Sequence, residues 1–129
     1  MSNDWKVVYY SERSGLVPVK EYMNRLSVNE RAKTLAFVRF LEEKGPNLPR
    51  PYADLLEDGI HELRIKLTGT QVRILYFFCH QNIIVLTNVF EKYSDKVPKE
   101  QIKLAKENRN DFLNRFSEKD IKECIYDDF

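Results

Sequence analysis

Alternation of polar and apolar residues in the middle of the chain is the feature that most constrains its fold. Residues 62–67, ELRIKL, alternate with period two, which indicates a strand with one buried face. Gly69 permits the backbone conformation of a tight turn, and a second strand is predicted over residues 72–78. A third run, residues 83–90, is apolar on both sides. The stretch from Asp58 to Lys92 therefore predicts three consecutive antiparallel strands.

The pairing of the first two strands follows from which side chains share a face, because opposed residues of antiparallel strands point to the same side. A two-residue turn at Gly69 and Thr70, or a four-residue loop over residues 68–71, places Lys66 opposite Arg73. A three-residue loop would mix polar and apolar side chains on each face. The predicted apolar face comprises Leu63, Ile65, Leu67, Val72, Ile74 and Tyr76. The opposite face carries Glu62, Arg64, Lys66, Gln71 and Arg73, with Leu75 and Phe77 further from the turn.

The register of the third strand decides whether a third cation joins this face. A two-residue turn at Gln81 and Asn82 places Phe90 beside Arg73 and sends Lys92 to the same side. Lys66, Arg73 and Lys92 then converge. Such a cluster is unfavourable unless the cations share an anion, for which an RNA phosphate is a candidate.

Length and composition favour one folded domain. The chain has 129 residues, 43% hydrophobic and 32% charged, which fits a globular protein and excludes a disordered one. It has no apolar run of membrane-spanning length, and MSNDWKVVYY lacks a basic segment followed by an apolar one, so we expect a cytoplasmic protein. The net charge of +1 divides into −3 for residues 117–129 and +4 for residues 1–116. The expected organisation is a modestly basic domain, residues 1–116, with an acidic tail.

Helical signals flank the strands on both sides. Residues 5–10 form a short β-prone run, and Pro18 is suited to the first turn of a helix over residues 17–26. Ser27 and Glu30 have the spacing of a capping box at the head of a second helix, which ends before Gly45. The apolar stripe of that helix comprises Leu35, Val38 and Leu41, with Phe37 and Phe40 beside it.

Residues 53–58 are expected to form at most a short turn before the strands. After the strands, Pro98 begins a last helix with residues 102, 105, 109, 112 and 116 at helical spacing. The order β-α-α-β-β-β-α predicts an α+β fold, with helices packed to one side of an antiparallel sheet. The first two helices form a hairpin on one sheet face.

The acidic tail has three interpretations. Residues 117–129 form an end without fixed structure, a helix packed on the body, or an extension that covers the basic face. Ile121 and Ile125 are four residues apart, which supports a short helix that also uses Phe129.

The strand segment resembles the phage-derived HigB-like toxins of the RelE/ParE superfamily. The pattern in that family is a Gly, an aromatic residue and ELRI, then an Arg followed by ILYF, a strand ending in F-x-K, and a Pro before a last helix with Ala. The matching residues here are Gly59, ELRI at 62–65, RILYF at 73–77, FEK at 90–92, Pro98 and Ala105. His61 stands where the family commonly has Tyr, and Tyr93 and Ser94 follow Lys92 where it often has a second Lys and a Thr.

The resemblance implies a RelE-like fold and the toxin of a type II toxin-antitoxin system. Such toxins cleave messenger RNA, usually in the ribosomal decoding site, and are held inactive by a helix-turn-helix (HigA-like) antitoxin. The implied partners are this antitoxin, messenger RNA and the ribosome, with DNA reached only through the antitoxin.

RNA cleavage without a metal uses the ribose 2′-hydroxyl as nucleophile, so the enzyme must orient it, neutralise the phosphorane and protonate the leaving oxygen. A planar guanidinium such as that of Arg73 is able to grip two phosphate oxygens. Lys66 is a candidate base or phosphate contact, and Lys92 a candidate for the phosphate or the leaving oxygen. Arg64 is expected to bind substrate, and Tyr93 to stack on a base or donate its hydroxyl. The alternatives are solvated strand cations and a packed surface tyrosine.

Other titratable groups fit structural roles better. Alternate residues of a strand point to the same side, so His61 shares the apolar face with Leu63 and Ile65. This position favours a core or edge histidine over a catalytic base. Glu62 falls on the cationic face, where a salt bridge to Arg64 or Lys66 is the simpler role. Cys79 and Cys124 have no metal-ligand spacing, and no cluster indicates a metal or cofactor.

The sequence thus predicts a metal-independent endoribonuclease with Arg73, Lys66 and Lys92 as catalytic residues and Arg64 and Tyr93 as substrate-binding residues. Two alternatives remain open. One is a ParE-like protein that binds and poisons DNA gyrase on the same scaffold. The other is a catalytically decayed member that acts only as an interaction protein.

Overall fold

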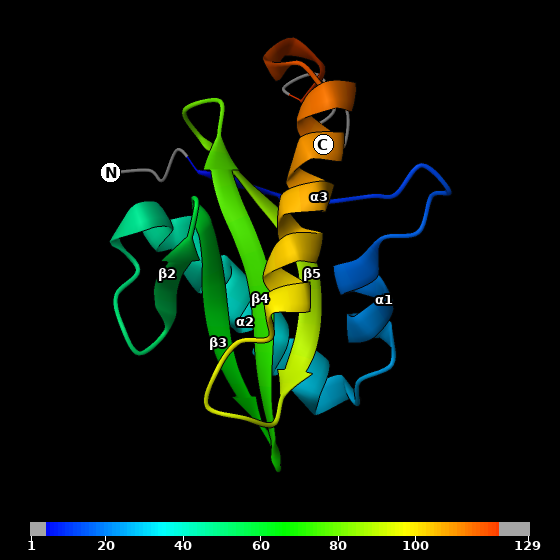
Figure 1. The fold of residues 1–129 in the computed structure, drawn as a ribbon. Coiled ribbons are helices and arrows are strands. Elements are labelled where there is room, and N and C mark those ends of the chain that lie inside the picture. The colour runs from blue at the N-terminus through cyan, green and yellow to red at the C-terminus, as the bar shows by residue number, and fades with distance from the viewer. Residues whose placement is uncertain (1–4, 122–129) are drawn as a thin grey trace.

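A five-stranded sheet separates two helical layers in the computed structural model, which describes residues 5–121 (Figure 1). Helices α1 (Pro18–Asn24) and α2 (Val28–Lys44) cover one face, and α3 (Lys99–Arg115) lies on the other. The α+β class is confirmed. The expectation that the helices pack to one side is wrong, because the sheet buries apolar side chains on both faces.

The sheet is mixed rather than antiparallel. Its order is β1-β5-β4-β3-β2, and the strands are β1 (Lys6–Tyr9), β2 (Ala53–Glu57), β3 (Ile60–Leu67), β4 (Thr70–Cys79) and β5 (Ile83–Lys92). β1 pairs with β5 in parallel, whereas the other neighbours are antiparallel. No hairpin joins β1 to β5: the chain leaves β1 through α1 and α2 and enters the opposite edge of the sheet at β2 (Figure 1). Because β1 and β5 are far apart in the chain, no local turn determines whether they pair in parallel or antiparallel.

The edge strand β2 corrects the prediction of a short turn over residues 53–58. Ala53 pairs with Leu63 and is buried, whereas Leu55 is exposed. The register shifts between Leu55 and Glu57, which marks a bulge. A short edge strand with a bulge is stabilised by its backbone hydrogen bonds to the neighbouring strand. Its own sequence therefore gives only a weak signal for strand structure. Before it, the proline-rich linker contains the single-turn helix η1 (Gly45–Asn47).

The hairpin between β3 and β4 has the predicted faces but a different register. Arg64 pairs with Arg73 and Lys66 with Gln71, so the prediction that Lys66 lies opposite Arg73 is wrong. The turn consists of Thr68 and Gly69, and Gly69 takes the positive φ of 71°. The register is displaced by two residues from the prediction, which preserves the face of every side chain.

The register between β4 and β5 agrees with the prediction at the site, because Phe90 pairs with Arg73. The connection differs from the expected two-residue turn: Cys79 pairs with Ile83 across a three-residue loop. A bulge at Thr87 restores the register, since Leu75 pairs with Asn88 and the next β4 residue with Leu86.

The helices begin where their capping residues predict. Ser27 is the N-cap of α2, and its Oγ accepts a hydrogen bond from the Glu30 amide at 3.2 Å. Pro18 occupies the first turn of α1, and Pro98 is the N-cap of α3. α2 ends at Gly45, where a positive φ of 54° terminates the helix.

Two cores lie on opposite sides of the sheet. The first joins α1 and α2 to the predicted apolar face of β3 and β4, all six of whose residues are buried there. The second joins α3 to Ile60, Leu75, Phe77 and Phe90. Ile121 is buried in this second core, which supports the helical interpretation of the tail as far as the described residues extend. Cys124, Ile125 and Phe129 lie outside them.

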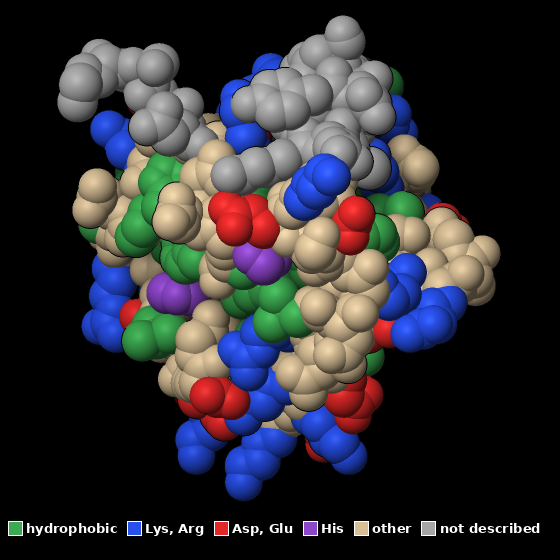
Figure 2. Space-filling model, turned by 90° about the horizontal axis from the view of Figure 1, so that it is seen from above, with side chains coloured by type: hydrophobic (Ala, Val, Ile, Leu, Met, Phe, Trp, Pro, Cys, Tyr) green, Lys and Arg blue, Asp and Glu red, His purple; other side chains and the backbone are tan. Residues whose placement is uncertain are grey.

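The surface at the end remote from the Thr68–Gly69 turn mixes charges of both signs. Seen from above, basic and acidic side chains are interspersed, and both histidines of the chain are visible there (Figure 2). Within residues 5–121, no helix has the length and apolar character needed to cross a membrane.

Candidate functional site

Cationic side chains occupy two neighbouring rows of the α3-side face of the sheet, near the Thr68–Gly69 turn. The row nearest the turn consists of Lys66, Gln71 and Lys92, and the next consists of Arg64, Arg73 and Phe90. Lys66 and Lys92 therefore flank Gln71, and Arg64 is the direct neighbour of Arg73. We call Arg64, Lys66, Arg73 and Lys92 the cationic site.

The four cations differ in their access to solvent. Lys66 is exposed and Lys92 is half-buried. The Arg64 side chain is 31% exposed, but that of Arg73 only 8%. Lys66 is thus the most accessible of the four cations, and Arg73 is the least accessible.

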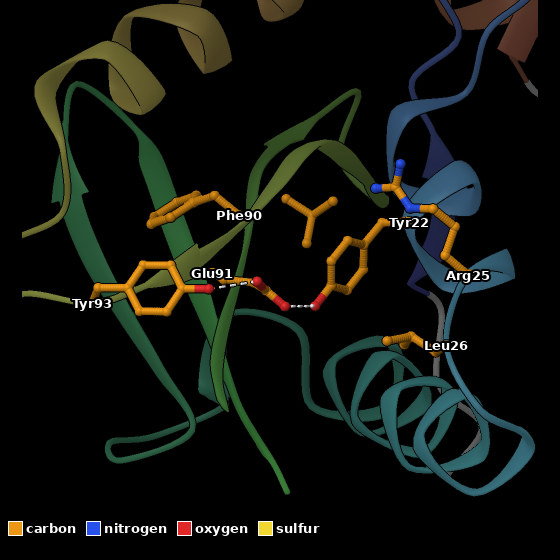
Figure 3. Close-up of a pocket in the computed structure, with 7 residues that line it drawn as sticks. Tyr22, Arg25, Leu26, Phe90, Glu91 and Tyr93 are labelled. Carbon is orange, nitrogen blue, oxygen red and sulfur yellow. Dashed lines mark hydrogen bonds between the residues drawn. The ribbon is translucent and has the colours of Figure 1, made fainter. Parts of the chain in front are cut away.

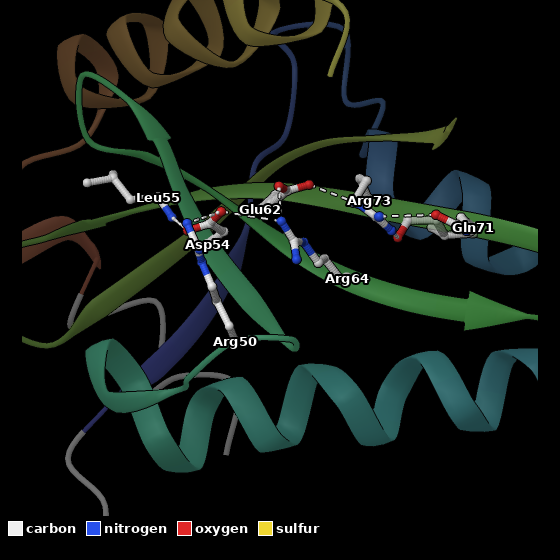
Figure 4. Close-up of polar contacts among 8 residues, drawn as sticks. Arg50, Asp54, Leu55, Glu62, Arg64, Gln71 and Arg73 are labelled. Carbon is white, nitrogen blue, oxygen red and sulfur yellow. Dashed lines mark hydrogen bonds and ion pairs between the residues drawn. The ribbon is translucent and has the colours of Figure 1, made fainter. Parts of the chain in front are cut away.

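Glu62 supplies the shared anion that the convergence of cations requires. Its side chain is 3% exposed, and its Oε1 lies 2.9 Å from Arg73 Nε (Figure 4). Its Oε2 lies 3.3 Å from Arg64 Nη2. The expected salt bridge between Glu62 and Arg64 is confirmed, and the pair with Arg73 is an addition. The chain thus holds both guanidiniums with its own carboxylate.

The ion pairs continue from Glu62 to the edge of the sheet. Arg64 Nη2 lies 3.3 Å from Asp54 Oδ2, which Arg50 Nη2 approaches to 3.0 Å (Figure 4). Cations and carboxylates therefore alternate across three strands, in the order Arg50, Asp54, Arg64, Glu62 and Arg73. We call this series the ion-pair ladder.

The Arg73 guanidinium is fixed on several sides. Nη1 donates to the Val72 carbonyl oxygen and Nη2 to Gln71 Oε1, both at 3.2 Å. Burial lowers the pKa of Arg73, and the charge of Glu62 opposes that effect. Arginine nevertheless stays protonated in proteins, so a positive charge is held in one geometry in the row next to Lys66 and Lys92.

Sequence reasoning missed the edge of the ladder. Asp54 belongs to a strand that was expected to be a turn, so it had no assigned face. The ion pair between Glu62 and Arg73 follows from the observed register. Glu62 pairs with Leu75, which lies two residues from Arg73 and on the same face of β4. The alternation of side chains along each strand identified the residues of the cationic site. The distances between these residues depended on the register that the turn sets.

A buried polar network fixes α3 beside the cationic site. Thr87, the bulged residue of β5, donates its hydroxyl to the Leu75 carbonyl at 3.1 Å. Its own carbonyl accepts from Asn108 Nδ2 at 3.1 Å, and Asn88 Nδ2 donates to Gln101 Oε1 at 3.0 Å. Two residues of β5 are thereby bonded to α3 next to the rows of cations.

Tyr93 lies at the end of β5 rather than over the rows. Its side chain is among the most exposed large hydrophobic groups, at 85%. Its hydroxyl donates to Glu91 Oε1 at 2.7 Å, and this bond raises the pKa of the Tyr93 phenol. Tyr93 therefore presents its ring, with its proton retained, at the border of the site.

His61 has the position that parity predicted. Its ring stacks on Tyr76 with centroids 5.2 Å apart and meets Phe78 edge-on at 5.0 Å. The ring belongs to the α2-side face, away from the cationic site. Burial lowers the pKa of His61, an effect that Asp54 opposes. Among residues 5–121, no group of three or more His, Cys, Asp or Glu side chains is placed to hold a metal ion.

The lowered pKa of His61 predicts a pH-dependent stability. The unfolded histidine titrates near 6.5, above the folded one, so the unfolded state binds more protons between the two values. The free energy of unfolding should therefore fall as the pH drops below about 6.5. Urea unfolding of the wild type and of His61→Phe, each at pH 7.5 and at pH 5.0, tests this expectation. The variant should lose less unfolding free energy than the wild type when the pH is lowered. Equal pH dependence in both proteins would contradict the assignment.

The chain matches a family model in comparisons with known proteins. Residues 21–110 match the model described as Phage derived protein Gp49-like (DUF891), from α1 to within α3. The matched part includes β2 to β5 and thus every residue of the cationic site. No curated protein matches the chain. The chain belongs to the phage-derived Gp49-like family, a toxin-like family related to the RelE/ParE toxins.

Proposed function

We propose that the chain is the HigB-like toxin of a type II toxin-antitoxin system and cleaves translated messenger RNA at the ribosome, in the cytoplasm, without a metal. The observation that carries this proposal is the cationic site itself. Four cations from three adjacent strands share one face, and only two carboxylates of the ladder, Asp54 and Glu62, oppose them. The remaining positive charge favours a phosphate ligand.

The arrangement supports a division of tasks in strand cleavage. The ribose 2′-oxygen attacks the adjacent phosphorus and releases its proton to solvent water, the bond from phosphorus to the 5′-oxygen breaks, and the leaving oxygen takes up a proton. Arg64 and Arg73 neutralise the phosphorane charge from fixed positions. Lys66 orients the 2′-hydroxyl, and Lys92, on the far side of Gln71, protonates the leaving oxygen. The products are a 2′,3′-cyclic phosphate and a 5′-hydroxyl.

The family relationship supports a neutralising partner. We propose a small helix-turn-helix antitoxin of the HigA-like kind, which reaches DNA itself and brings the toxin with it. An adjacent reading frame for such a protein is the expected genetic context. Co-expression of that protein should restore growth to cells that express the toxin.

Induced expression with mapping of messenger RNA ends tests the nuclease. The wild type should produce new 5′-hydroxyl ends, and Arg64→Ala or Lys66→Ala should reduce their yield by about 10- to 100-fold. These side chains are more exposed than Arg73, so the variants are less prone to unfold. Lys44→Ala, at the exposed end of α2, is the matched control and should cleave as the wild type does.

The same cells discriminate the competing functions. Growth arrest without new RNA ends, together with inhibited supercoiling by purified gyrase, would replace the nuclease with a gyrase poison. Normal growth with intact messenger RNA would indicate a catalytically decayed interaction protein.

A further inference from the structure

A groove of ≈ 510 Å³ lies at the end of β5, between this strand and α1 (Figure 3). It is separate from the rows of cations but adjoins them through the end of the strand. Its lining includes Tyr22, Arg25 and Leu26 from α1 and its end, and Val89, Glu91 and Tyr93 from β5 and its end. Phe90 of β5 is the third aromatic residue of the lining, beside Tyr22 and Tyr93, so three aromatic residues, one cation and one carboxylate line a small open groove.

Glu91 is held between the two tyrosines of this groove. The Tyr93 hydroxyl donates to Oε1 at 2.7 Å, and the Tyr22 hydroxyl donates to Oε2 at 3.0 Å (Figure 3). Burial and the bond to Glu91 raise the pKa of Tyr22, so both tyrosines remain donors at neutral pH. Each carboxylate oxygen has two lone pairs, so an oriented carboxylate retains acceptor capacity toward a ligand.

We propose that this groove binds one base of the RNA substrate and selects guanine. The inference rests on the proposed ribonuclease function and adds the base that the enzyme prefers. Aromatic rings are the usual platforms on which proteins stack unpaired RNA bases, and Tyr93 is 85% exposed. The Arg25 guanidinium lies over the Tyr22 ring, 5.8 Å from its centroid, and adds a second planar surface.

Guanine is favoured by the pattern of donors that a carboxylate requires. Its Watson–Crick edge presents two adjacent donors, N1–H and the N2 amino group, which a carboxylate accepts as a charge-assisted pair. Adenine and cytosine each place a ring-nitrogen acceptor beside their single amino group, and uracil places a carbonyl on each side of its N3–H. Those acceptors would face the negative charge of Glu91, which disfavours all three bases.

The position of Glu91 links the groove to the site of cleavage. Lys92 follows Glu91 in the strand and points to the opposite face, in the row with Gln71. The end of β5 thus offers a cation for a phosphate on one side and a carboxylate for a base on the other. An RNA strand that crosses this end places a base in the groove beside a phosphate at Lys92.

Binding of uncleavable RNA tests the inference independently of catalysis. The probes are 2′-O-methyl tetranucleotides UUGU, UUAU, UUCU and UUUU, titrated into the purified full-length protein. UUGU should bind at least about tenfold more tightly than the other three and shift the NMR signals of Tyr22 and Tyr93. Glu91→Gln should abolish that preference. Glu43→Gln removes a negative charge from the exposed surface of α2 instead. This control variant should retain the preference for guanine.

The outcomes separate this inference from the proposed function. Equal affinity for the four probes, or a guanine preference that survives Glu91→Gln, would overturn the guanine subsite. If messenger RNA is still cut in that case, the proposed nuclease function is supported and only the guanine subsite is rejected. A guanine preference that requires Glu91, in a protein that cuts no RNA, would support the subsite and contradict the nuclease.

Discussion

Arg73→Ala is expected to destabilise the protein by about 3–5 kcal/mol, because it leaves the Glu62 carboxylate buried without its nearest partner. Glu62 Oε1 lies 2.9 Å from Arg73 Nε, and the two side chains are 3% and 8% exposed. Among the described residues, Arg64 is then the one remaining ion-pair partner of Glu62, at 3.3 Å. Urea unfolding followed by circular dichroism measures the loss.

Two further variants separate the buried pair from ordinary loss of a side chain. Glu62→Leu combined with Arg73→Leu removes both charges and should recover most of the stability, since apolar pairs replace buried ion pairs at little cost. Arg13→Ala breaks a surface pair with Asp111, in which the arginine is 73% exposed, and should cost about 0–1 kcal/mol. If Arg73→Ala costs no more than Arg13→Ala, Glu62 does not depend on Arg73.

This result also determines how activity data should be interpreted. A loss of toxicity in Arg73→Ala has two sources, since the substitution removes both a site cation and part of the folded state. Arg64→Ala and Lys66→Ala carry the functional test for that reason. Toxicity that falls in those variants while their urea midpoints stay unchanged assigns the effect to the site.

Gly45→Ala is the second substitution with a large expected effect, a loss of about 2–5 kcal/mol. Gly45 has a φ of 54°, which an L side chain rarely adopts. A Cβ there would lie 2.5 Å from Trp5 Nε1 and 2.6 Å from Trp5 Cδ1. The indole is itself packed edge-on against Phe78, with centroids 5.1 Å apart, so it has little room to move.

Gly15→Ala is the matched control for that substitution. Gly15 also has a positive φ, 96°, but within residues 5–121 no atom beyond its two chain neighbours lies within 4 Å of the position that a Cβ would take. It should lose only about 1–2 kcal/mol through backbone strain. Trp5 is the sole tryptophan of the chain, so its fluorescence should change in Gly45→Ala and not in Gly15→Ala. Equal losses in the two variants would show that contact with Trp5 is unimportant.

Local patterns predicted most elements of the fold. Period-two alternation placed the six apolar residues of β3 and β4 on one face, and the Ser27 cap and Pro18 placed the two helix starts. These signals work because side-chain direction in a strand and orphan amides at a helix end depend on near neighbours. The edge strand β2 was missed for the opposite reason, since it is stabilised by pairing with β3.

The membership of the cationic site was likewise predictable from the sequence, whereas its internal geometry was not. Parity assigned Arg64, Lys66, Arg73 and Lys92 to one face, and a shift of two residues in the turn changed which of them are opposed without changing that face. Contacts that require distant segments escaped prediction: Asp54 reaches Arg64 from the edge strand, and Tyr22 reaches Glu91 from α1.

What the sequence determined by itself was therefore the three consecutive strands β3 to β5, the faces of their side chains and the charge that one face carries, because these depend on spacing along the chain. Only the tertiary structure decided that Glu62 neutralises Arg73 beside the row of Lys66 and Lys92, that α3 covers the second face, and that α1 completes a groove around Glu91. Those features depend on turn geometry and on packing between segments far apart in the chain, which no local pattern encodes.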